Sequence, residues 1–317
     1  MRCGTGFTPQ NAVFVVGPTA SGKSEFAFLL AKKLNGAIIS ADSMQLWRGL
    51  DIGTAKESAA RREEIPHFML DVADPDEEFS VARWREQALD CLSEVRNRGL
   101  LPIFVGGTGL YFESLFYPMT FADEDKNPVL RAELESAYDS EGGEKMLARL
   151  AVLDPESAAR LHPNDKKRVV RALEIASAGK KLSRLEDRRQ NPDVTAVGFN
   201  AAERAKLYAR IDERVDIMLK SGLCAEIARL APDFSWQSMQ AIGYKEFAPF
   251  ADRISDGKIR LDRDEIRAVA ELIKKHTRNY AKRQLTWFRR YPFVKWFELG
   301  DFDGAEQYVI GRLKAAK

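Results

Sequence analysis

One segment near the start of the chain has the residues and the spacing of a phosphate-binding loop. The run Gly17-Pro18-Thr19-Ala20-Ser21-Gly22-Lys23-Ser24 has two glycines separated by four residues, followed by lysine and serine. Backbone amides of such a loop point at a phosphate chain, Lys23 adds a positive charge, and the Ser24 hydroxyl can hold a magnesium ion. The loop predicts a bound di- or triphosphate with Mg2+ and does not by itself identify the phosphate compound.

The neighbouring pattern places this loop between a strand and a helix. Ala12–Val16 is a short apolar run rich in β-branched residues, and Ser24–Leu34 has apolar residues at helical spacing. Further short apolar runs predict strands at Ala37–Ala41, Phe68–Val72, Ile103–Val105, Thr195–Phe199 and Val294–Leu299. Strands that alternate with helices predict an α/β fold, with a P-loop-type parallel sheet core flanked by helices.

The pattern changes near residue 117. A charged stretch bounded by Pro118 and Pro128 precedes four helical segments, Val129–Tyr138, Glu144–Leu150, Glu156–Leu161 and Lys166–Ala178. We therefore predict a helical insertion domain at residues 118–194. Residues 1–117 and 195–317 then form the catalytic core, whose C-terminal part is helical.

Polar residues follow three of the predicted strands. In an open parallel sheet, ligands bind outside the carboxyl ends of the strands. Asp42, followed by Ser43-Met44-Gln45, can hold magnesium, act as a general base, or cap the next helix. Thr108, in a Gly-Gly-Thr-Gly run, is a second candidate, although it could simply cap the next helix. Asp71 is the third candidate. Arg214 is a candidate phosphate ligand or a solvated helix charge.

The segment between Glu271 and Glu298 contains no carboxylate. Its eight basic residues are Lys274, Lys275, Arg278, Lys282, Arg283, Arg289, Arg290 and Lys295. Helical spacing places Lys275, Lys282 and Arg289 on one stripe, with Tyr280, Trp287 and Phe288 interleaved. Such a pattern suits phosphate neutralisation and base stacking on RNA, although a charge run is also typical of a solvated helix face.

Five motifs in the same order resemble the tRNA dimethylallyltransferase family, also called the tRNA isopentenyltransferase or IPP transferase family. They are Gly17–Ser24, Asp42–Gln45 continuing into Arg48–Lys56, Gly106–Tyr111, Ala241–Lys245 and Lys282–Arg289. Their order and spacing match over nearly the whole chain. Trp47, Phe68 and Lys167 depart from residues that are common in the family, and none of them belongs to the core of the chemistry.

The resemblance implies transfer of a dimethylallyl group from its diphosphate to the exocyclic amine of an adenosine adjacent to the anticodon in tRNA, with Mg2+. Asp42 then matches the general base, Thr108 a residue near the reacting carbon, and Lys23 and Arg214 stabilise the leaving diphosphate. The positions that the resemblance assigns to tRNA binding are Asp42, Ser43, Met44, Gln45, Thr108, Arg131, Lys167, Arg168, Val169, Val170, Arg171, Gln240, Ala241, Ile242, Gly243, Tyr244, Lys245, Lys282, Arg283, Gln284, Leu285, Thr286, Trp287, Phe288 and Arg289.

Three other functions compete with this one. A small-molecule kinase would use the same loop for ATP, and a related alkyl transferase would act on free AMP. A non-catalytic RNA-binding module would have lost its phosphate chemistry, which the intact Lys23, Ser24 and Asp42 argue against.

Composition limits the setting. The 317 residues are 45% hydrophobic and 30% charged with a net charge of +2, and no apolar run is long enough to span a membrane. Cys3, Cys91 and Cys224 are odd in number and far apart, which suits neither a disulfide framework nor a zinc site. We expect a cytoplasmic monomer that contacts no membrane.

Overall fold

The computed structural model describes residues 11–117, 119, 127–180 and 192–315, which divide into two compact units. Of the described residues, 11–115 and 192–315 belong to one unit, and 116, 117, 119 and 127–180 belong to the other. The predicted domain boundary at residue 118 and the thiol of Cys3 lie outside the described residues.

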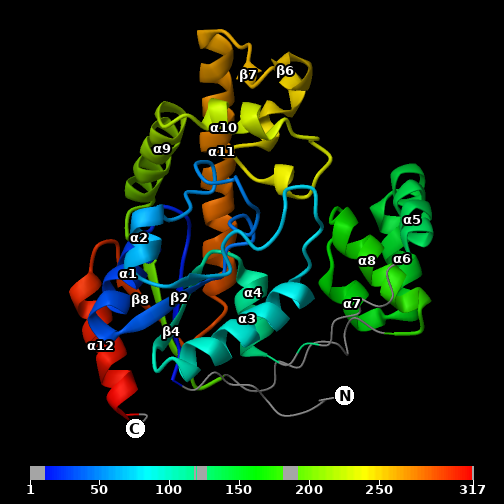
Figure 1. Cartoon of the computed structure of the whole chain (residues 1–317). Helices are drawn as coiled ribbons and strands as arrows, with labels where there is room; N and C mark the ends of the chain where they lie inside the picture. Colours follow the sequence, from blue (N-terminus) through cyan, green and yellow to red (C-terminus); the bar gives the residue numbers. More distant parts are fainter. Residues whose placement is uncertain (1–10, 118, 120–126, 181–191, 316–317) are drawn as a thin grey trace. The chain divides into compact units, whose positions relative to one another are not determined.

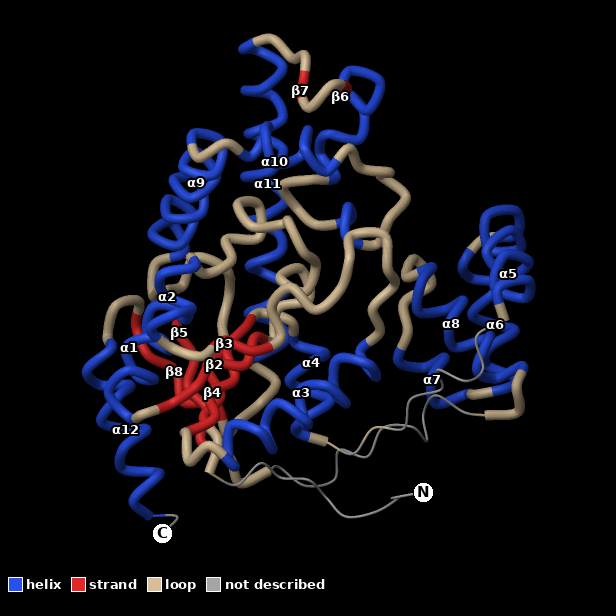
Figure 2. The backbone as a smooth tube through the Cα atoms, in the orientation of Figure 1, coloured by secondary structure: helices blue, strands red, loops and turns tan. Residues whose placement is uncertain are grey.

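The larger unit is built on a parallel sheet (Figure 2). Its six strands are β1 (Val13–Val16), β2 (Gly36–Ser40), β3 (His67–Phe68), β4 (Leu101–Gly106), β5 (Thr195–Asn200) and β8 (Val294–Glu298), in the order β3-β2-β4-β1-β5-β8. Every pair is parallel, with Val13 opposite Ile103 on one side and Thr195 on the other. The predicted α/β fold with a parallel sheet is confirmed.

One predicted strand is wrong in extent. The run Phe68–Val72 was expected to be extended, but β3 ends at Phe68, and Met69 and Asp71 have φ values of 61° and 56°. Left-handed residues cannot continue a strand. Asp71 pairs instead with Lys56 at 2.6 Å and Arg62 at 2.6 Å, and the two cations hold its pKa below the usual value despite partial burial.

Helices cover the sheet of the larger unit. They are α1 (Lys23–Leu34), α2 (Ala59–Glu64), α3 (Val81–Asn97), α4 (Gly109–Phe116) and α12 (Phe302–Ala315). The central strands β1 and β2 are fully buried because their apolar runs face helices on both sides, whereas β8 at one edge has exposed residues. Phe14 of β1 stacks on Phe104 of β4 with ring centres 5.2 Å apart.

A helical extension completes the same unit beyond the carboxyl ends of the strands (Figure 1). It consists of α9 (Arg204–Lys220), α10 (Leu223–Leu230), the 3-10 helices η3 (Ser238–Gln240) and η4 (Lys245–Arg253), the short strands β6 (Ile254–Ser255) and β7 (Lys258–Ile259), and α11 (Arg263–Phe288). Asp262 and Glu265 form a capping box that starts α11. None of the helices in the described ranges is long and apolar enough to cross a bilayer.

Four helices make up most of the described part of the smaller unit. Its helices are α5 (Pro128–Glu141), α6 (Gly143–Leu153), α7 (Pro155–Arg160) and α8 (Lys166–Ser177), as the four apolar patterns predict. Asn127, Asp154 and Asp165 cap α5, α7 and α8 by accepting a backbone N–H each. Met146 and Leu150 pack against α8 in its core.

Candidate active site

The phosphate-binding loop adopts the strand-to-helix turn that its sequence predicts. Gly17 and Gly22 have φ values of 142° and 86°, and α1 begins at Lys23 directly after Gly22. A Cβ on Gly17 would lie 3.0 Å from the carbonyl oxygen of Phe199, so the loop passes close to β5. The free amides at the start of α1 therefore face the carboxyl edge of the sheet, where they favour an anion.

Two cations, the buried Lys23 and the half-buried Arg214, face this loop, and neither forms an ion pair with another described residue. Burial lowers the pKa of Lys23 from 10.5 to about 8, a net shift that the Asp42 charge opposes and the Arg214 charge assists. Lys23 Nζ donates to the Pro18 carbonyl at 3.2 Å. Arg214 of α9 forms no ion pair within the described residues, and burial lowers its pKa too. Two cations beside a helix N-terminus suit a multiply charged anion, and Arg214 lines the same cavity as Lys23, so its role as a phosphate ligand stays a prediction.

Asp42 and Thr108 are brought together by close approach of the ends of β2 and β4. A Cβ on Gly106 would lie 2.1 Å from the Ala41 carbonyl oxygen, so only glycine fits there. The Thr108 hydroxyl accepts from Ser43 N at 2.9 Å and donates to Ser43 Oγ at 3.1 Å. Thr108 thus binds the Asp42 segment through its hydroxyl.

Asp42 itself does not cap a helix. Its Oδ1 accepts from Met44 N at 3.0 Å, inside a turn that ends without helical structure. Its charge acts on Lys23, Arg214 and Tyr280 at the same edge of the sheet. The choice between a metal-holding carboxylate and a general base stays open on geometry alone.

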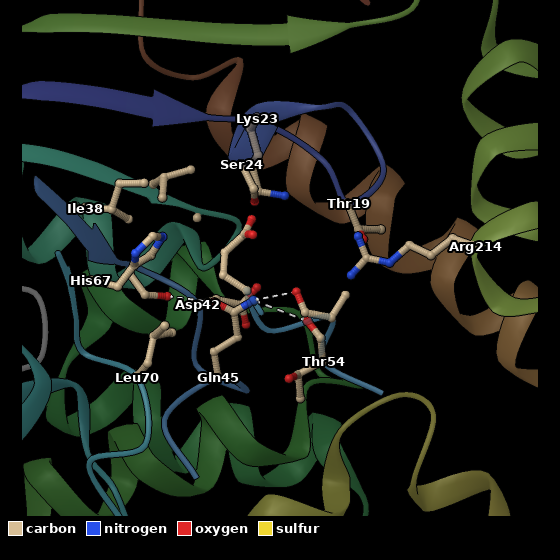
Figure 3. A pocket seen from close by; sticks show the side chains of 15 residues that line it. Thr19, Lys23, Ser24, Ile38, Asp42, Gln45, Thr54, His67, Leu70 and Arg214 are labelled. Carbon is tan, nitrogen blue, oxygen red and sulfur yellow. Dashed lines mark hydrogen bonds between the residues drawn. The ribbon is translucent and has the colours of Figure 1, made fainter. Parts of the chain in front are cut away.

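Two cavities meet at Asp42. The first is lined by the phosphate-binding residues Lys23 and Ser24 together with the ends of β2 and β4, and Figure 3 shows Lys23, Ser24, Asp42 and Arg214 around it. The second is lined by α9, α11 and residues near η3. Four residues line both cavities: Thr19, Asp42, Thr54 and Arg214. One reactant held by phosphate and another held in the second cavity would therefore come together beside Asp42.

Few groups at this site could hold a metal ion. No cluster of three histidine, cysteine or acidic side chains that could hold one occurs in the described part of the chain. Ser24 and Asp42 line the first cavity and supply oxygen atoms. Mg2+ commonly binds through one or two protein oxygens, substrate phosphates and water, so these residues fit such an ion.

The helix α11 has one face on the site and another in solvent. Lys275, Lys282, Arg283, Thr286 and Arg289 are exposed. Two other basic residues of the carboxylate-free segment are neutralised from α9: Lys274 pairs with Asp216 at 2.8 Å, and Arg278 with Asp212 at 2.5 Å. The basic surface left for a polyanion is narrower than the sequence implies.

Two side chains of the Lys282–Arg289 motif point into the interior. Phe288 is fully buried against Phe112, with ring centres 5.5 Å apart, so its ring packs in the core. Gln284 is also buried; its Oε1 accepts from Thr19 N at 2.8 Å and its Nε2 donates to the Gly107 carbonyl at 2.9 Å. Gln284 therefore fixes the phosphate-binding loop against the turn that carries Thr108.

One side of the Trp287 ring packs against the backbone of Gly109. A Cβ on Gly109 would lie 2.2 Å from Trp287 Cδ1, and Trp287 Nε1 donates to Tyr291 Oη at 3.1 Å. The Arg290 guanidinium lies 4.2 Å from the centre of the Trp287 ring. Leu285 is half-buried and packs toward α9. These contacts favour an anchoring role for Trp287 in the core.

In the Ala241–Lys245 motif, too, some residues line a cavity and others are buried in the interior. Gln240, Ala241, Ile242 and Lys245 line the second cavity. Gly243 and Tyr244 are buried, and Tyr244 donates to Glu226 at 2.5 Å. The side chain of Tyr244 therefore packs in the interior, and the tRNA contact predicted at this position stays a prediction.

In the smaller unit, only part of the predicted basic cluster is available. Lys167 and Arg168 are exposed on α8, whereas the side chains of Val169 and Val170 are buried. Arg131 and Arg171 both pair with the buried carboxylate of Glu174, at 2.6 and 2.7 Å, and together they hold the pKa of that carboxyl below its usual value.

Sequence reasoning missed the inner face of α11. Ile273, Thr277 and Tyr280 line the second cavity, and Gln284 continues the same face. Their spacing of three to four residues is the available signal. Burial and the nearby Asp42 charge raise the pKa of Tyr280, so its hydroxyl stays protonated beside the site.

Comparison with known proteins agrees with this arrangement. The family model described as IPP transferase matches residues 45–291. The tRNA dimethylallyltransferase of Bacillus subtilis (strain 168) is 44% identical over 297 residues, covering 92% of each chain. That of Thermoanaerobacter sp. (strain X514) is 40% identical over 317 residues, covering 95% of this chain and 98% of the relative.

Solved structures give the same answer. A full-length tRNA isopentenylpyrophosphate transferase from Bacillus halodurans has a TM-score of 0.68 at 37% identity, with 97% of this chain and 98% of that chain covered. A eukaryotic dimethylallyltransferase acting on tRNA has a TM-score of 0.75 at 27% identity, with 95% and 77% covered. Two cavities that meet beside a phosphate-binding loop, five family motifs and near full-length similarity together show that this chain belongs to the IPP transferase family, whose relatives named above are tRNA dimethylallyltransferases.

Proposed function

We propose that the chain transfers the dimethylallyl group of dimethylallyl diphosphate to the exocyclic amine of an adenosine adjacent to the anticodon in tRNA. The observation that carries this proposal is the junction of two cavities at Thr19, Asp42, Thr54 and Arg214. One cavity supplies cations for a diphosphate, and the other opens between the helices that carry the basic surface. The named activity of the relatives supports the same reaction.

The leaving group needs electrostatic stabilisation. As the bond between the allylic carbon and the diphosphate oxygen breaks, its electron pair stays on the diphosphate, which gains charge. Lys23, Arg214 and the amides at the start of α1 surround that position and are already oriented before the reaction. A Mg2+ ion held by the Ser24 hydroxyl would add charge neutralisation at the phosphates.

The acceptor needs a base. An exocyclic adenine amine is a weak nucleophile because its lone pair is delocalised into the ring, and it must lose a proton when the new nitrogen–carbon bond forms. Asp42 lies at the junction of the two cavities and accepts that proton in this proposal. Thr108 holds the Asp42 segment through Ser43, which fixes the direction of the carboxylate.

The RNA is held by exposed cations. Lys275 and Lys282 of α11 and Arg289, which follows its last residue, neutralise phosphates. Arg283 lies at the second cavity, where the extruded base would enter. Lys167 and Arg168 of the smaller unit add a second contact. The helical insertion at residues 118–194 then acts as a tRNA-binding domain of a monomeric, cytoplasmic enzyme.

The decisive experiment incubates the purified chain with dimethylallyl diphosphate, Mg2+ and an unmodified tRNA transcript, followed by mass analysis of the nucleosides. We expect a dimethylallyl adenosine at the position next to the anticodon and stoichiometric diphosphate release. ATP hydrolysis without tRNA and without prenylation would support the kinase instead. Equal transfer to free AMP would point to the AMP-specific alkyl transferase.

A further inference from the structure

Three consecutive backbone amides near the site converge on one carboxylate. Glu226 of α10 accepts hydrogen bonds from Asp51 N at 2.9 Å, Ile52 N at 2.7 Å and Gly53 N at 3.2 Å. Successive N–H groups of this kind form a concave site for an anion. Here the anion is a side chain from a residue more than 170 positions later in the sequence.

Tyr244 completes this arrangement. Its hydroxyl donates to Glu226 Oε1 at 2.5 Å, and both side chains are buried, with Glu226 4% and Tyr244 0% exposed. Burial and the Glu226 charge raise the pKa of Tyr244, which keeps the phenol protonated as a donor. A Cβ on Gly53 would lie 2.4 Å from Tyr244 Cε2, so the ring packs directly on the backbone of Gly53.

The anchored loop continues into the wall of both cavities. Gly53 lines the second cavity, and Thr54 lines both. The side-chain amide of Gln45 donates to the carbonyls of Thr54 and Ala55 at 3.3 Å each, and Gln45 N donates to the Asp42 carbonyl at 3.3 Å. The position of residues 51–55 is therefore transmitted to the turn that carries Asp42.

Burying the Glu226 carboxylate costs folding free energy. It forms no ion pair in the described part of the chain, and burial of a charge that is compensated only by hydrogen bonds is expensive. Four donors surround it, so it acts solely as an acceptor, as the ionised form does. A neutral amide could not accept all four hydrogen bonds. Replacing the carboxylate by an amide therefore tests what these hydrogen bonds do.

We propose that Glu226 is a positioning residue for the transfer reaction. Together with Tyr244 it holds residues 51–53 so that Gln45 keeps the Asp42 turn in its reactive geometry. The inference rests on the proposed function, because it concerns the rate of that reaction. It assigns the buried part of the Ala241–Lys245 motif to the geometry of the site, in place of contact with RNA.

The test compares Glu226→Gln, Tyr244→Phe and the double variant with Ile227→Val, a control that loosens the packing of the same helix and leaves the carboxylate in place. Each is assayed for kcat, for KM of both substrates, for its melting temperature and for amide hydrogen exchange of residues 51–53. Loss of hydrogen bonds to a charged group predicts a fall in kcat of about 10- to 100-fold for Glu226→Gln, with KM for the diphosphate within about twofold. For Tyr244→Phe we expect kcat to fall by about 3- to 10-fold.

The double variant should be no slower than Glu226→Gln, because both groups act on one loop. Exchange at residues 51–53 should accelerate in both single variants and stay unchanged in Ile227→Val. If Glu226→Gln melts earlier but keeps its kcat within about twofold, the carboxylate is only structural and the inference is wrong. If Glu226→Gln does not fold, an unchanged kcat in Tyr244→Phe overturns it equally. A wild-type chain that transfers no prenyl group would refute the proposed function itself.

Discussion

The affinity for the diphosphate should fall steeply as the pH rises above about 8. The reason is that, in the ligand-free protein, the surroundings of Lys23 disfavour its charged form. Burial, with help from Arg214, lowers the pKa of Lys23 from 10.5 to about 8. A bound diphosphate places negative charge beside the ammonium group and raises that pKa again. At pH 7 the lysine is charged before the ligand arrives, whereas at pH 9 about nine tenths of the free protein must first take up a proton.

The expected magnitude follows from this linkage. The dissociation constant of a non-hydrolysable dimethylallyl diphosphate analogue should be about tenfold larger at pH 9 than at pH 7. Phosphate groups have lost their last proton near pH 6, so the ligand contributes little to the change. In the free protein the same shift destabilises the fold by about 3 kcal/mol below pH 8, since a pKa unit corresponds to about 1.4 kcal/mol. Stability should rise between about pH 8 and 10.5, where the unfolded chain binds more protons than the folded one.

Calorimetric titrations from pH 7 to 9.5, without tRNA, measure this dependence. Lys23→Met keeps the length of the side chain and should bind more weakly, with no slope above pH 8. Arg214→Met should also bind the diphosphate more weakly. In this variant the affinity should begin to fall at a higher pH, because the cation that helps to lower the Lys23 pKa is gone. An affinity that is constant within twofold in the wild type, or a slope that persists in Lys23→Met, would refute the reasoning.

Three further changes separate binding from chemistry. Asp42→Asn should keep both substrates bound but lose about 100- to 10,000-fold in single-turnover transfer, and a loss of less than threefold would remove Asp42 as the base. Replacement of Lys275, Lys282 and Arg289 by alanine should weaken tRNA binding and flatten the plot of log affinity against log salt by about one unit per phosphate contact, with diphosphate affinity unchanged as the control. Gln284→Leu should weaken diphosphate binding by leaving Thr19 N without its acceptor, and unchanged calorimetric affinity in a folded variant would contradict that role.

The parts of this molecule that depend on local sequence were predictable. The phosphate-binding loop lies within eight residues, and its glycines, lysine and flanking patterns each indicate the same turn. The strands and the four helices of the smaller unit follow from apolar spacing. β3 is the exception, since nothing in the residue types of Met69 and Asp71 signals a left-handed backbone.

Contacts between distant segments were not predictable from a single sequence. Gln284 lies 265 positions from Thr19, and its motif is so rich in basic residues that it suggests a single RNA-binding surface. Helical spacing shows that α11 has distinct faces but not which face is covered. Phe288 and Tyr244 were therefore placed with the RNA contacts, although packing and a buried carboxylate determine their positions.

The amide of Gln284 has a thermodynamic consequence. Its neighbours Arg283 and Lys282 face solvent, while its own side chain holds Thr19 N and the Gly107 carbonyl. Any displacement of α11 that accompanies RNA binding must move an acceptor of the phosphate-binding loop. The two ligands are then energetically linked, and the factor by which tRNA changes the affinity for the diphosphate equals the factor by which the diphosphate changes the affinity for tRNA. If RNA binding displaces this helix, the affinity of the protein for each substrate depends on whether the other is bound.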